Sequence, residues 1–357
     1  MSKEKLSRRQ AVCLLSGLLF AGIGGVSSRE YLEDGLSGGG GCPEGRVPLI
    51  YSHRYNISAF GIERLHPFDG SKYRKIHDYL VKKGLRRPGD FLQPQGLEQE
   101  ELELVHTGQY LRSLERSRKL ARILEVPLLS SMPHALIDWR ILKPMRLACS
   151  GTIQAARLAL RHGLAINIGG GYHHAGGDRG GGFCVYADIP TAIASLRAAK
   201  PELKALIVDT DAHQGDGFAS LAANDERTFV LDFFEDDIYP FPKVEEDMAV
   251  PLPPGTTAGQ YMKLLAAKLP EAIEKFRPDL IFYNAGSDVL SSDPLSRFQI
   301  EPEEMVSRDF FVVSTARKRN LPLAMVLAGG YSSESARAHA LSIAKIISTF
   351  DRKPVST

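Results

Sequence analysis

Residues 205–217 read ALIVDTDAHQGDG, an apolar strand-like run that passes directly into a cluster of acids and one histidine. Successive side chains of an extended chain alternate between its two sides, so Asp209, Asp211 and His213 are expected on one face. Acids crowded at the end of a buried strand are costly unless a cation or hydrogen-bond donors neutralise them. The stretch therefore predicts a strand of a buried sheet that ends in a cation site. The alternative is an acid-rich turn that caps the next helix.

Five further apolar runs have the length and the β-branched or aromatic composition expected for strands buried on both faces of a parallel sheet. Together with the first run, the predicted strands are Val47–Tyr51, Ala165–Ile168, Ala205–Val208, Phe229–Leu231, Leu280–Tyr283 and Leu323–Leu327. Helical periodicity marks the segments between them, namely most of 75–160 and Gly151–His162, Ile189–Ala199, Ala258–Phe276, Pro302–Lys318 and Ser333–Thr349. This alternation predicts an α/β fold, with a single-domain, open, mostly parallel β-sheet flanked by helices over residues 47–350.

A second polar segment follows the predicted strand 280–283, where Asn284-Ala285-Gly286-Ser287 leads to Asp288. Open α/β sheets bind ligands beyond the carboxyl ends of their strands, so Asp288 is expected beside Asp211 and His213. Two carboxylates and one imidazole leave zinc an open position for water or substrate, which is typical of a catalytic zinc site. A zinc site built from cysteines is not expected, because no C-x-x-C pair occurs among Cys13, Cys42, Cys149 and Cys184.

Two adjacent histidines, His173 and His174, follow another predicted strand in a glycine-rich segment. Imidazoles near a metal can act as general base and general acid, and carboxylates such as Asp209 and Asp216 are candidates to orient them. The alternative is that both histidines are metal ligands. The last predicted strand ends in Gly329-Gly330-Tyr331, and a tyrosine at this sheet edge can donate a hydrogen bond to a developing oxyanion.

Composition sets limits on partners and location. The net charge of +2 does not predict direct nucleic acid binding, because such binding usually needs a strongly basic face. Residues 1–28 combine Lys3, Lys5, Arg8 and Arg9 with the apolar run 11–26, which is typical of a signal peptide of twin-arginine type. We therefore expect export to the periplasm or cell envelope, with N-terminal contacts to a membrane or to the export machinery. The alternative is an amphipathic or anchoring leader on a cytoplasmic protein. Residues 29–46 are expected to form a glycine-rich linker.

Taken together, the motifs resemble the histone deacetylase family over about residues 47–348. The shared segments are Gly170-Gly171-Tyr172-His173-His174, Asp209-x-Asp211-x-His213-x-Gly215-Asp216-Gly217, Asn284-Ala285-Gly286-x-Asp288 and Gly329-Gly330-Tyr331. Several flanking segments are most similar to the class IV branch, namely Leu65-His66-Pro67-Phe68-Asp69, Asp178-Arg179-Gly180-Gly181-Gly182-Phe183-Cys184 and Ile238-Tyr239-Pro240. The resemblance implies the three-layer fold of arginases and deacetylases, with the catalytic domain at 47–350.

The resemblance also implies roles for individual residues in removing acyl groups from lysine side chains of proteins or peptides. Asp211, His213 and Asp288 would bind one catalytic zinc ion. His174 would act as general base and then as acid, oriented by Asp216, while His173, paired with Asp209, would assist electrostatically. Tyr331 would donate to the substrate carbonyl, Phe183 and Tyr239 would flank the acyl-lysine channel, and Gly182 would accept a hydrogen bond from the substrate. A structural monovalent cation such as K⁺ is implied near Asp209, Asp211 and His213.

Other readings stay open from the sequence. An amidohydrolase of the same fold could act on acetylpolyamines or another small acylated amine. A two-metal ureohydrolase of arginase type would need more paired acids than the sequence offers, and a deacetylase-like binding module would be expected to lack part of the site. The class IV resemblance raises long-chain fatty acyl groups as substrates. Asp232 replaces the serine of many family members at the inner cation site and is predicted just after a strand.

Overall fold

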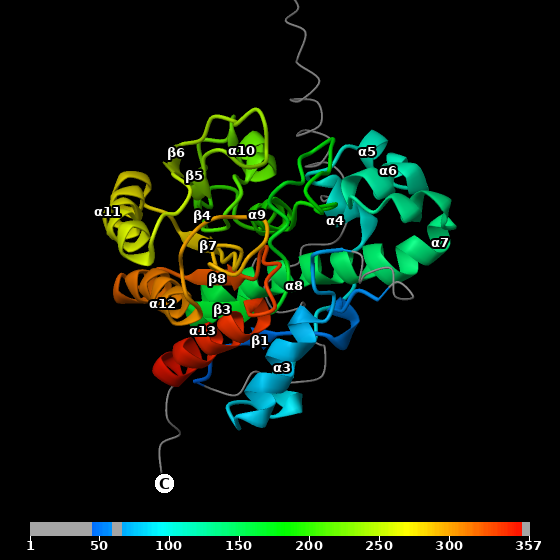
Figure 1. The fold of residues 1–357 in the computed structure, drawn as a ribbon. Helices are drawn as coiled ribbons and strands as arrows, with labels where there is room; N and C mark the ends of the chain where they lie inside the picture. Colours follow the sequence, from blue (N-terminus) through cyan, green and yellow to red (C-terminus); the bar gives the residue numbers. More distant parts are fainter. Residues whose placement is uncertain (1–44, 59–65, 352–357) are drawn as a thin grey trace, which may run out of the picture. The chain divides into compact units, whose positions relative to one another are not determined.

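Parallel strands form the centre of the computed structural model, which describes residues 45–58 and 66–351. These residues build an eight-stranded sheet in the order β2-β1-β3-β8-β7-β4-β5-β6 (Figure 1). Every neighbouring pair of strands is parallel. The strands are β1 (Leu49–Ile50), β2 (Phe91–Leu92), β3 (Leu164–Asn167), β4 (Ala205–Asp209), β5 (Thr228–Glu235), β6 (Met248–Leu252), β7 (Leu280–Asn284) and β8 (Leu323–Val326).

Helices supply most of the crossovers between the strands, and the connection from β5 to β6 contains none. The longer ones are α3 (Lys72–Lys82), α8 (Lys143–His162), α9 (Asp188–Arg197), α11 (Ala258–Phe276), α12 (Pro302–Lys318) and α13 (Ser335–Phe350). The shorter ones are α4 (Gln99–Glu103), α5 (Gly108–Ser113), α6 (Ser117–Ile123), α7 (His134–Ile137) and α10 (Asp216–Ala222). Single turns lie at η2 (His53–Tyr55), η4 (Pro88–Asp90) and η5 (Pro127–Ser131), and the π-helical turn η6 (Asp138–Leu142) leads into α8.

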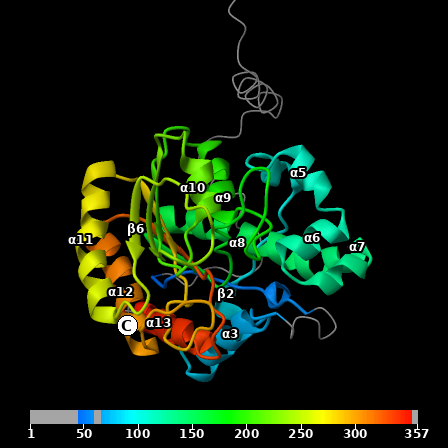
Figure 2. The same ribbon diagram turned by 45° about the horizontal axis from the view of Figure 1, so that its top comes forward.

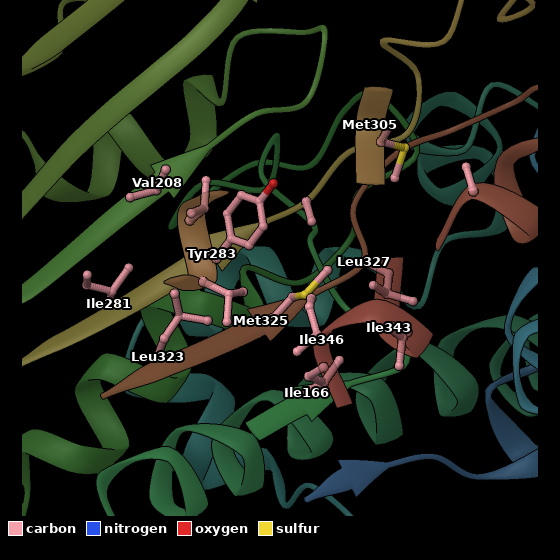
Figure 3. Packing of buried hydrophobic residues seen from close by; sticks show 14 of the residues in the cluster. Ile166, Val208, Ile281, Tyr283, Met305, Leu323, Met325, Leu327, Ile343 and Ile346 are labelled. Carbon is pink, nitrogen blue, oxygen red and sulfur yellow. The ribbon is translucent and has the colours of Figure 1, made fainter. Parts of the chain in front are cut away.

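Two hydrophobic cores cover the two faces of the sheet, because successive strand residues point to opposite sides. Leu206 and Val208 of β4 belong to the core that α3, α11, α12 and α13 close, whereas Ala205 and Ile207 belong to the core that α8 and α9 close. Figure 3 shows the first of these cores, where strand side chains such as Met325 lie near Ile343 and Ile346 of α13. Figure 2 shows α11, α12 and α13 grouped on one side. The result is an α/β sheet with helices on both faces.

Helix boundaries follow the local sequence. α8 ends at Gly163, whose φ of 80° is the left-handed conformation that favours glycine. Thr257 and Gln260 form a capping box at the start of α11, and Pro302 occupies the first turn of α12, where its missing N–H costs nothing. These signals lie in the sequence itself, and α11 and α12 have the predicted bounds.

The predicted fold class is confirmed, with three differences in detail. The six predicted strands correspond to β1, β3, β4, β5, β7 and β8, but two edge strands, β2 and β6, were not predicted. α8 begins eight residues before the predicted segment. Asp232 lies inside β5, because this strand extends to Glu235, so its predicted place after a strand was wrong.

The predicted leader (1–28) lies outside the described residues, and so does nearly all of the predicted linker (29–46). Along the described part of the chain, no helix combines the length and the apolar character that a membrane span requires.

Candidate active site

Four loops converge at the carboxyl edge of the sheet because their strands β3, β8, β7 and β4 are consecutive neighbours. β3 leads to His173 and His174, β8 to Tyr331, β7 to Asp288, and β4 to the segment 210–215. Parallel strands end at the same edge, so segments far apart in sequence meet there. The order of the strands thus places every predicted polar cluster beside another one.

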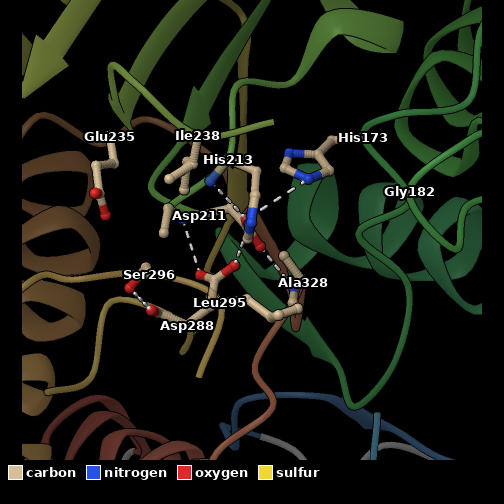
Figure 4. A network of polar contacts seen from close by, with 12 residues as sticks. His173, Gly182, Asp211, His213, Glu235, Ile238, Asp288, Leu295, Ser296 and Ala328 are labelled. Carbon is tan, nitrogen blue, oxygen red and sulfur yellow. Dashed lines mark hydrogen bonds and ion pairs between the residues drawn. The ribbon is translucent and has the colours of Figure 1, made fainter. Parts of the chain in front are cut away.

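Asp211, His213 and Asp288 form the centre of this edge, and all three are buried. The Nδ1 atom of His213 lies 3.2 Å from Oδ1 of Asp211 and 2.9 Å from Oδ2 of Asp288. One ligand atom from each residue lies within 4.8 Å of the others, and Figure 4 shows the two carboxylates directed toward the imidazole. Backbone N–H groups hold the carboxylates in place, since Gly329 donates to Asp211 at 2.8 Å and Ala212 donates to Asp288 at 2.8 Å.

The charges of this cluster fit a divalent cation. Burial and the neighbouring carboxylate of Asp211 raise the pKa of Asp288 to about 8, because two adjacent buried negative charges oppose one another. A cation removes this opposition and allows both acids to ionise together. A zinc ion prefers such nitrogen and oxygen ligands, and three protein ligands leave a coordination position for the reacting groups. The residues present therefore fit zinc, with His213 and the two aspartates as its ligands.

His173 forms a hydrogen bond with the carboxylate of Asp209, next to this cluster. Its Nδ1 lies 3.0 Å from Oδ2 of Asp209, whose Oδ1 accepts from the side chain of Asn284 at 2.9 Å. Burial lowers the pKa of His173, but the carboxylates of Asp211 and Asp209 outweigh burial and raise this pKa to about 9. These carboxylates therefore favour the protonated form of His173.

His174 has the opposite character. Its Nδ1 lies 2.7 Å from Oδ1 of Asp216, and Arg179 donates to Oδ2 of the same carboxylate at 2.8 Å. Burial and the charge of His173 lower the pKa of His174 to about 3, despite the carboxylate of Asp216. His174 is therefore neutral, with Nδ1–H donating to Asp216 and Nε2 free to accept a proton. A neutral imidazole with a free Nε2 has the form and the orientation that a general base needs.

Tyr331 also lies beside the cluster. The centre of its ring is 6.4 Å from the centre of the His213 ring. Its backbone N–H donates to Oδ2 of Asp293 at 2.7 Å, which fixes the loop after β8. Burial and the carboxylates of Asp211 and Asp288 raise the pKa of Tyr331 well above its ordinary value, so the phenol keeps its proton. The hydroxyl makes no hydrogen bond with any residue that the structure describes, and it is thus available as a donor.

Phe183, Tyr239 and Gly182 line the approach to these groups. The ring of Phe183 lies 5.7 Å from that of Tyr331, and the ring of Tyr239 lies edge-on to His174 at 4.8 Å. A Cβ atom on Gly182 would come within 2.3 Å of the His174 ring, so only glycine fits beside the base. Phe183 has a φ of 68°, which is rare for a residue with a side chain and typical of a constrained functional site.

An apolar cavity lies beside these groups, and its volume is about 870 Å³ when the solvent space at its open mouth is included. Its lining combines His173, Gly182, Phe183 and Tyr331 of the candidate site with the apolar side chains of Leu124, Leu129, Ile141 and Met145. His66 lies in the wall, with its ring 4.1 Å from that of Phe183. Most of the lining is apolar, so the cavity suits a hydrocarbon group.

Lys72 is one functional residue that the sequence reasoning missed. Its side chain is fully buried and forms no ion pair with any residue that the structure describes, and its Nζ donates to the carbonyl oxygens of Ala328 at 2.7 Å and Gly329 at 3.2 Å. Burial lowers the pKa of Lys72 to about 8, against the opposing charges of Asp288 and Asp211. Lys72 thus holds the loop that carries Tyr331, and no motif around this lysine indicates that role.

Asp188 and Arg308 are buried supports of the site that were also missed. Asp188 accepts from the N–H groups of Gly171 and Tyr172, both at 2.9 Å, and so fixes the loop that carries the two histidines. Arg308 donates to the carbonyl oxygens of Thr210 at 2.9 Å and Gly286 at 2.7 Å. The position of Arg308 on the apolar face of the predicted helix 302–318, between Met305 and Val312, was a detectable signal.

The sequence matches a family model described as the histone deacetylase domain over residues 66–347. Histone deacetylase 2 of Arabidopsis thaliana is 41% identical over 304 residues, which cover 84% of this chain and 79% of the relative. The acetoin utilization protein AcuC of Bacillus subtilis is 30% identical over 268 residues, covering 70% of this chain and 67% of the relative.

A solved structure, the HD domain of HDA15, has the same fold. It superposes with a TM-score of 0.68 at 21% sequence identity, covering 85% of this chain and 92% of that one.

Proposed function

Because the chain belongs to the histone deacetylase domain family, we propose that it is a zinc-dependent hydrolase of the N6-acyl-lysine amide bond. The observation that carries this proposal is the pairing of a buried acid–histidine ligand set with a neutral imidazole, His174, next to an apolar cavity that His173, Gly182 and Tyr331 line. Amide hydrolysis needs these components together, since water is a weak nucleophile and an amine leaves only when protonated. A binding module would not need them.

Asp211, His213 and Asp288 would hold the zinc ion, which supplies Lewis-acid polarisation of the amide carbonyl and promotes ionisation of the attacking water. His174 accepts the proton of that water on Nε2, because its Nδ1 is already engaged with Asp216. The same Nε2–H then protonates the lysine nitrogen as the carbon–nitrogen bond breaks, so the products are a carboxylic acid and a free lysine amine.

Tyr331 and His173 would stabilise the negative charge that develops on the carbonyl oxygen during the reaction. The hydroxyl of Tyr331 donates to the carbonyl oxygen as it becomes negative, and its retained proton makes this possible at neutral pH. His173 lies close to the same centre, where its protonated form would favour the developing anion. Phe183 and Tyr239 exclude water from the acyl-lysine stem, and Gly182 would accept a hydrogen bond from it. A monovalent cation at the backbone oxygens near Asp209, Asp211 and His213 is part of the same proposal.

We propose that the acyl group is longer than acetyl. An acetyl group contributes two carbon atoms, whereas the apolar cavity is lined by Leu129, Ile141 and Met145 as well as by His173 and Tyr331. Each methylene group buried in such a lining contributes about 0.8 kcal/mol. The flanking motifs that are similar to class IV deacetylases support the same substrate class, and we propose membership of that branch. A small acylated amine such as an acetylpolyamine is the second candidate, supported by the same catalytic groups.

The test is release of lysine by the purified, zinc-loaded chain from acetyl-lysine and myristoyl-lysine peptides, with an acetylpolyamine in parallel. Tyr331→Phe and His174→Ala are the controls. Preferred turnover of the myristoyl peptide, lost in both variants, supports the proposal. Turnover of the polyamine alone keeps the catalytic assignment and refutes the substrate. Bound zinc with no turnover of any substrate refutes the proposed reaction.

A further inference from the structure

An unusual concentration of positive charge lies on α5 and α6. Residues 112–125 contain five basic and two acidic residues, a net charge of +3, whereas the whole chain has a net charge of only +2. The basic residues are Arg112, Arg116, Arg118, Lys119 and Arg122, and the four arginines are exposed. We refer to these five residues as the basic patch.

The basic patch has no ion-pair partner among the residues that the structure describes, although Glu115 and Glu125 lie in the same segment. None of its five residues forms an ion pair or a side-chain hydrogen bond with any residue in 45–58 or 66–351. Lys119 makes only a cation–π contact with the ring of Tyr110, at 5.9 Å. Arg118 and Arg122 are four residues apart on one helix, a spacing at which like charges destabilise the helix. This arrangement suits a partner that brings negative charge from outside.

The basic patch lies next to the loop that carries Phe183, which is proposed to flank the acyl-lysine channel. Ile123, the residue after Arg122, accepts a hydrogen bond from the N–H of Phe183 at 3.1 Å, and the next residue, Leu124, lines the cavity. At the other end, Thr107 donates to the carbonyl of Gly177 at 2.7 Å, and Tyr110 donates to that of Val185 at 2.8 Å. α5 and α6 are therefore bonded to both ends of the loop that carries Phe183 and Gly182.

The length of α6 limits how many residues of a peptide substrate can lie near the basic patch. α6 is seven residues long, which corresponds to about 10 Å at 1.5 Å per residue. An extended peptide advances about 3.3 Å per residue, so roughly three or four residues beside the acyl-lysine can lie along α6. This span is comparable to the Debye length of about 8 Å at physiological ionic strength, so charges in these positions interact with the arginines.

We propose that the basic patch selects acyl-lysines that are flanked by acidic residues, and that it disfavours lysines in basic segments such as histone tails. The inference rests on the lysine deacylase function proposed above and names its protein substrate class. The acyl-lysine itself is uncharged, so the flanking residues supply the charge that the patch recognises. A nucleic acid partner is not favoured, because the patch lies next to the loop proposed to flank the acyl-lysine channel and the chain as a whole carries little net charge.

The experiment compares two peptides with the same acyl-lysine, one with acidic and one with basic flanking residues, at low and high salt. We expect kcat/KM to favour the acidic peptide by about tenfold at low salt, because steering by complementary charge raises association rates by this order or more. High salt should remove most of the preference. Equal kcat/KM values for the two peptides at low salt would overturn the proposal.

Variants separate the patch from general charge effects. Arg118→Glu/Arg122→Glu should lose or reverse the preference, whereas Arg118→Lys/Arg122→Lys should keep it. The matched control is Lys263→Glu/Lys318→Glu on α11 and α12, which Figure 1 and Figure 2 show on the other side of the sheet from α6. It changes the net charge equally and should leave the preference intact. A loss of preference in this control would refute the role of the patch.

A measurement of peptide binding distinguishes failure of this proposal from failure of the proposed function. Fluorescence anisotropy with the same two peptides and the His174→Ala variant measures recognition without turnover. Tighter binding of the acidic peptide, lost in Arg118→Glu/Arg122→Glu, supports the patch even if the wild-type chain hydrolyses neither peptide. Turnover without a flank preference supports the reaction and refutes the patch. Binding of a short DNA duplex or of anionic lipid vesicles through the same arginines, with no effect of peptide flanks, would also refute it.

Discussion

His173 and His174 are neighbours in the chain, yet their surroundings shift their pKa values in opposite directions. Carboxylates on two sides of His173 raise its pKa to about 9, whereas burial and the adjacent positive charge lower that of His174 to about 3. His173 therefore favours its protonated form, whereas His174 is a proton acceptor. Both rings have a carboxylate partner, Asp209 or Asp216, so the difference comes from the second carboxylate, Asp211, beside His173 and from the burial and adjacent positive charge at His174.

Tyr331→Phe tests the oxyanion donor. We expect kcat to fall about 100- to 1,000-fold, which is the usual effect of removing one such donor. The stability of the fold should change little, because the hydroxyl has no hydrogen-bond partner along the described chain. The measurement is single-substrate kinetics alongside thermal unfolding. Turnover at the wild-type rate would contradict the assignment of Tyr331.

The variant Lys72→Met tests whether the buried charge of Lys72 makes the free energy of unfolding depend on pH. The folded pKa of Lys72, about 8, lies below its unfolded value of 10.5, so the native chain releases this proton first as pH rises. The unfolded chain then binds more protons between these two values, and the free energy of unfolding of the wild type should rise with pH in this window. The gain is at most about 3 kcal/mol.

The measurement for Lys72 is urea unfolding of both chains at pH 7.5 and pH 10. Lys72→Met should lack the rise, and its kcat should fall because the carbonyl groups of Ala328 and Gly329 lose their donor. Parallel pH dependence in the two chains would rule out the role of this lysine.

At the scale of elements, α12 is linked to two site loops through a single side chain. Arg308→Met leaves the carbonyl groups of Thr210 and Gly286 without a donor and leaves the carboxylate of Asp309 without its cation. Loss of one partner from such a buried pair costs about 3–5 kcal/mol of unfolding free energy. Chemical denaturation measures this loss, and the double variant Arg308→Met/Asp309→Asn should recover part of it. No recovery would mean that the backbone contacts dominate.

The elements show which parts of the fold can be predicted from sequence. Strands buried on both faces, such as β4 and β7, are continuous apolar runs, and α11 and α12 carry their own capping signals. β6 was missed because it is an edge strand with a proline and alternating exposed residues, Met248–Leu252, and β2 because it has only two residues. Short or partly exposed strands lack the composition that identifies buried ones.

The residues of the candidate site also fall into two groups, those that the sequence predicts and those that it does not. The groups proposed to act on a ligand lie in short loop motifs after strands, where local sequence predicts them, and the structure brings them together at one edge. Lys72, Asp188 and Arg308 support these loops from separate parts of the chain. Their roles depend on which backbone carbonyl or N–H groups come within reach, and that depends on tertiary packing.

At the scale of the whole molecule, the metal is expected to stabilise the fold. A ligand that binds only the native state adds RT ln(1 + [L]/Kd) to the unfolding free energy, about 4 kcal/mol at a thousandfold excess over Kd. A zinc chelator should therefore lower the unfolding temperature of the zinc-loaded chain. Asp288→Asn should show a much smaller response, because one ligand is weakened. An unfolding temperature that the chelator leaves unchanged would argue against a bound metal.

The leader is a separate prediction for the whole chain. We propose that residues 1–28 direct export through the twin-arginine route, with cytoplasmic residence as the alternative. Replacing Arg8 and Arg9 with lysine keeps the charge and removes the arginine pair that the export receptor reads. In a bacterial host, cell fractionation should then show the chain shifting from the envelope fraction to the cytoplasm. Envelope localisation of the variant would contradict this route.

The position of β8 has a consequence for biosynthesis. This strand is the last to leave the ribosome, yet it lies between β3 and β7 in the middle of the sheet. Until it is translated, the two halves of the nascent sheet expose unpaired edges, which are prone to association with other chains. Chaperones would have to shield these edges during most of synthesis, and a premature stop codon before Leu323 would yield an aggregation-prone polypeptide rather than a smaller working enzyme.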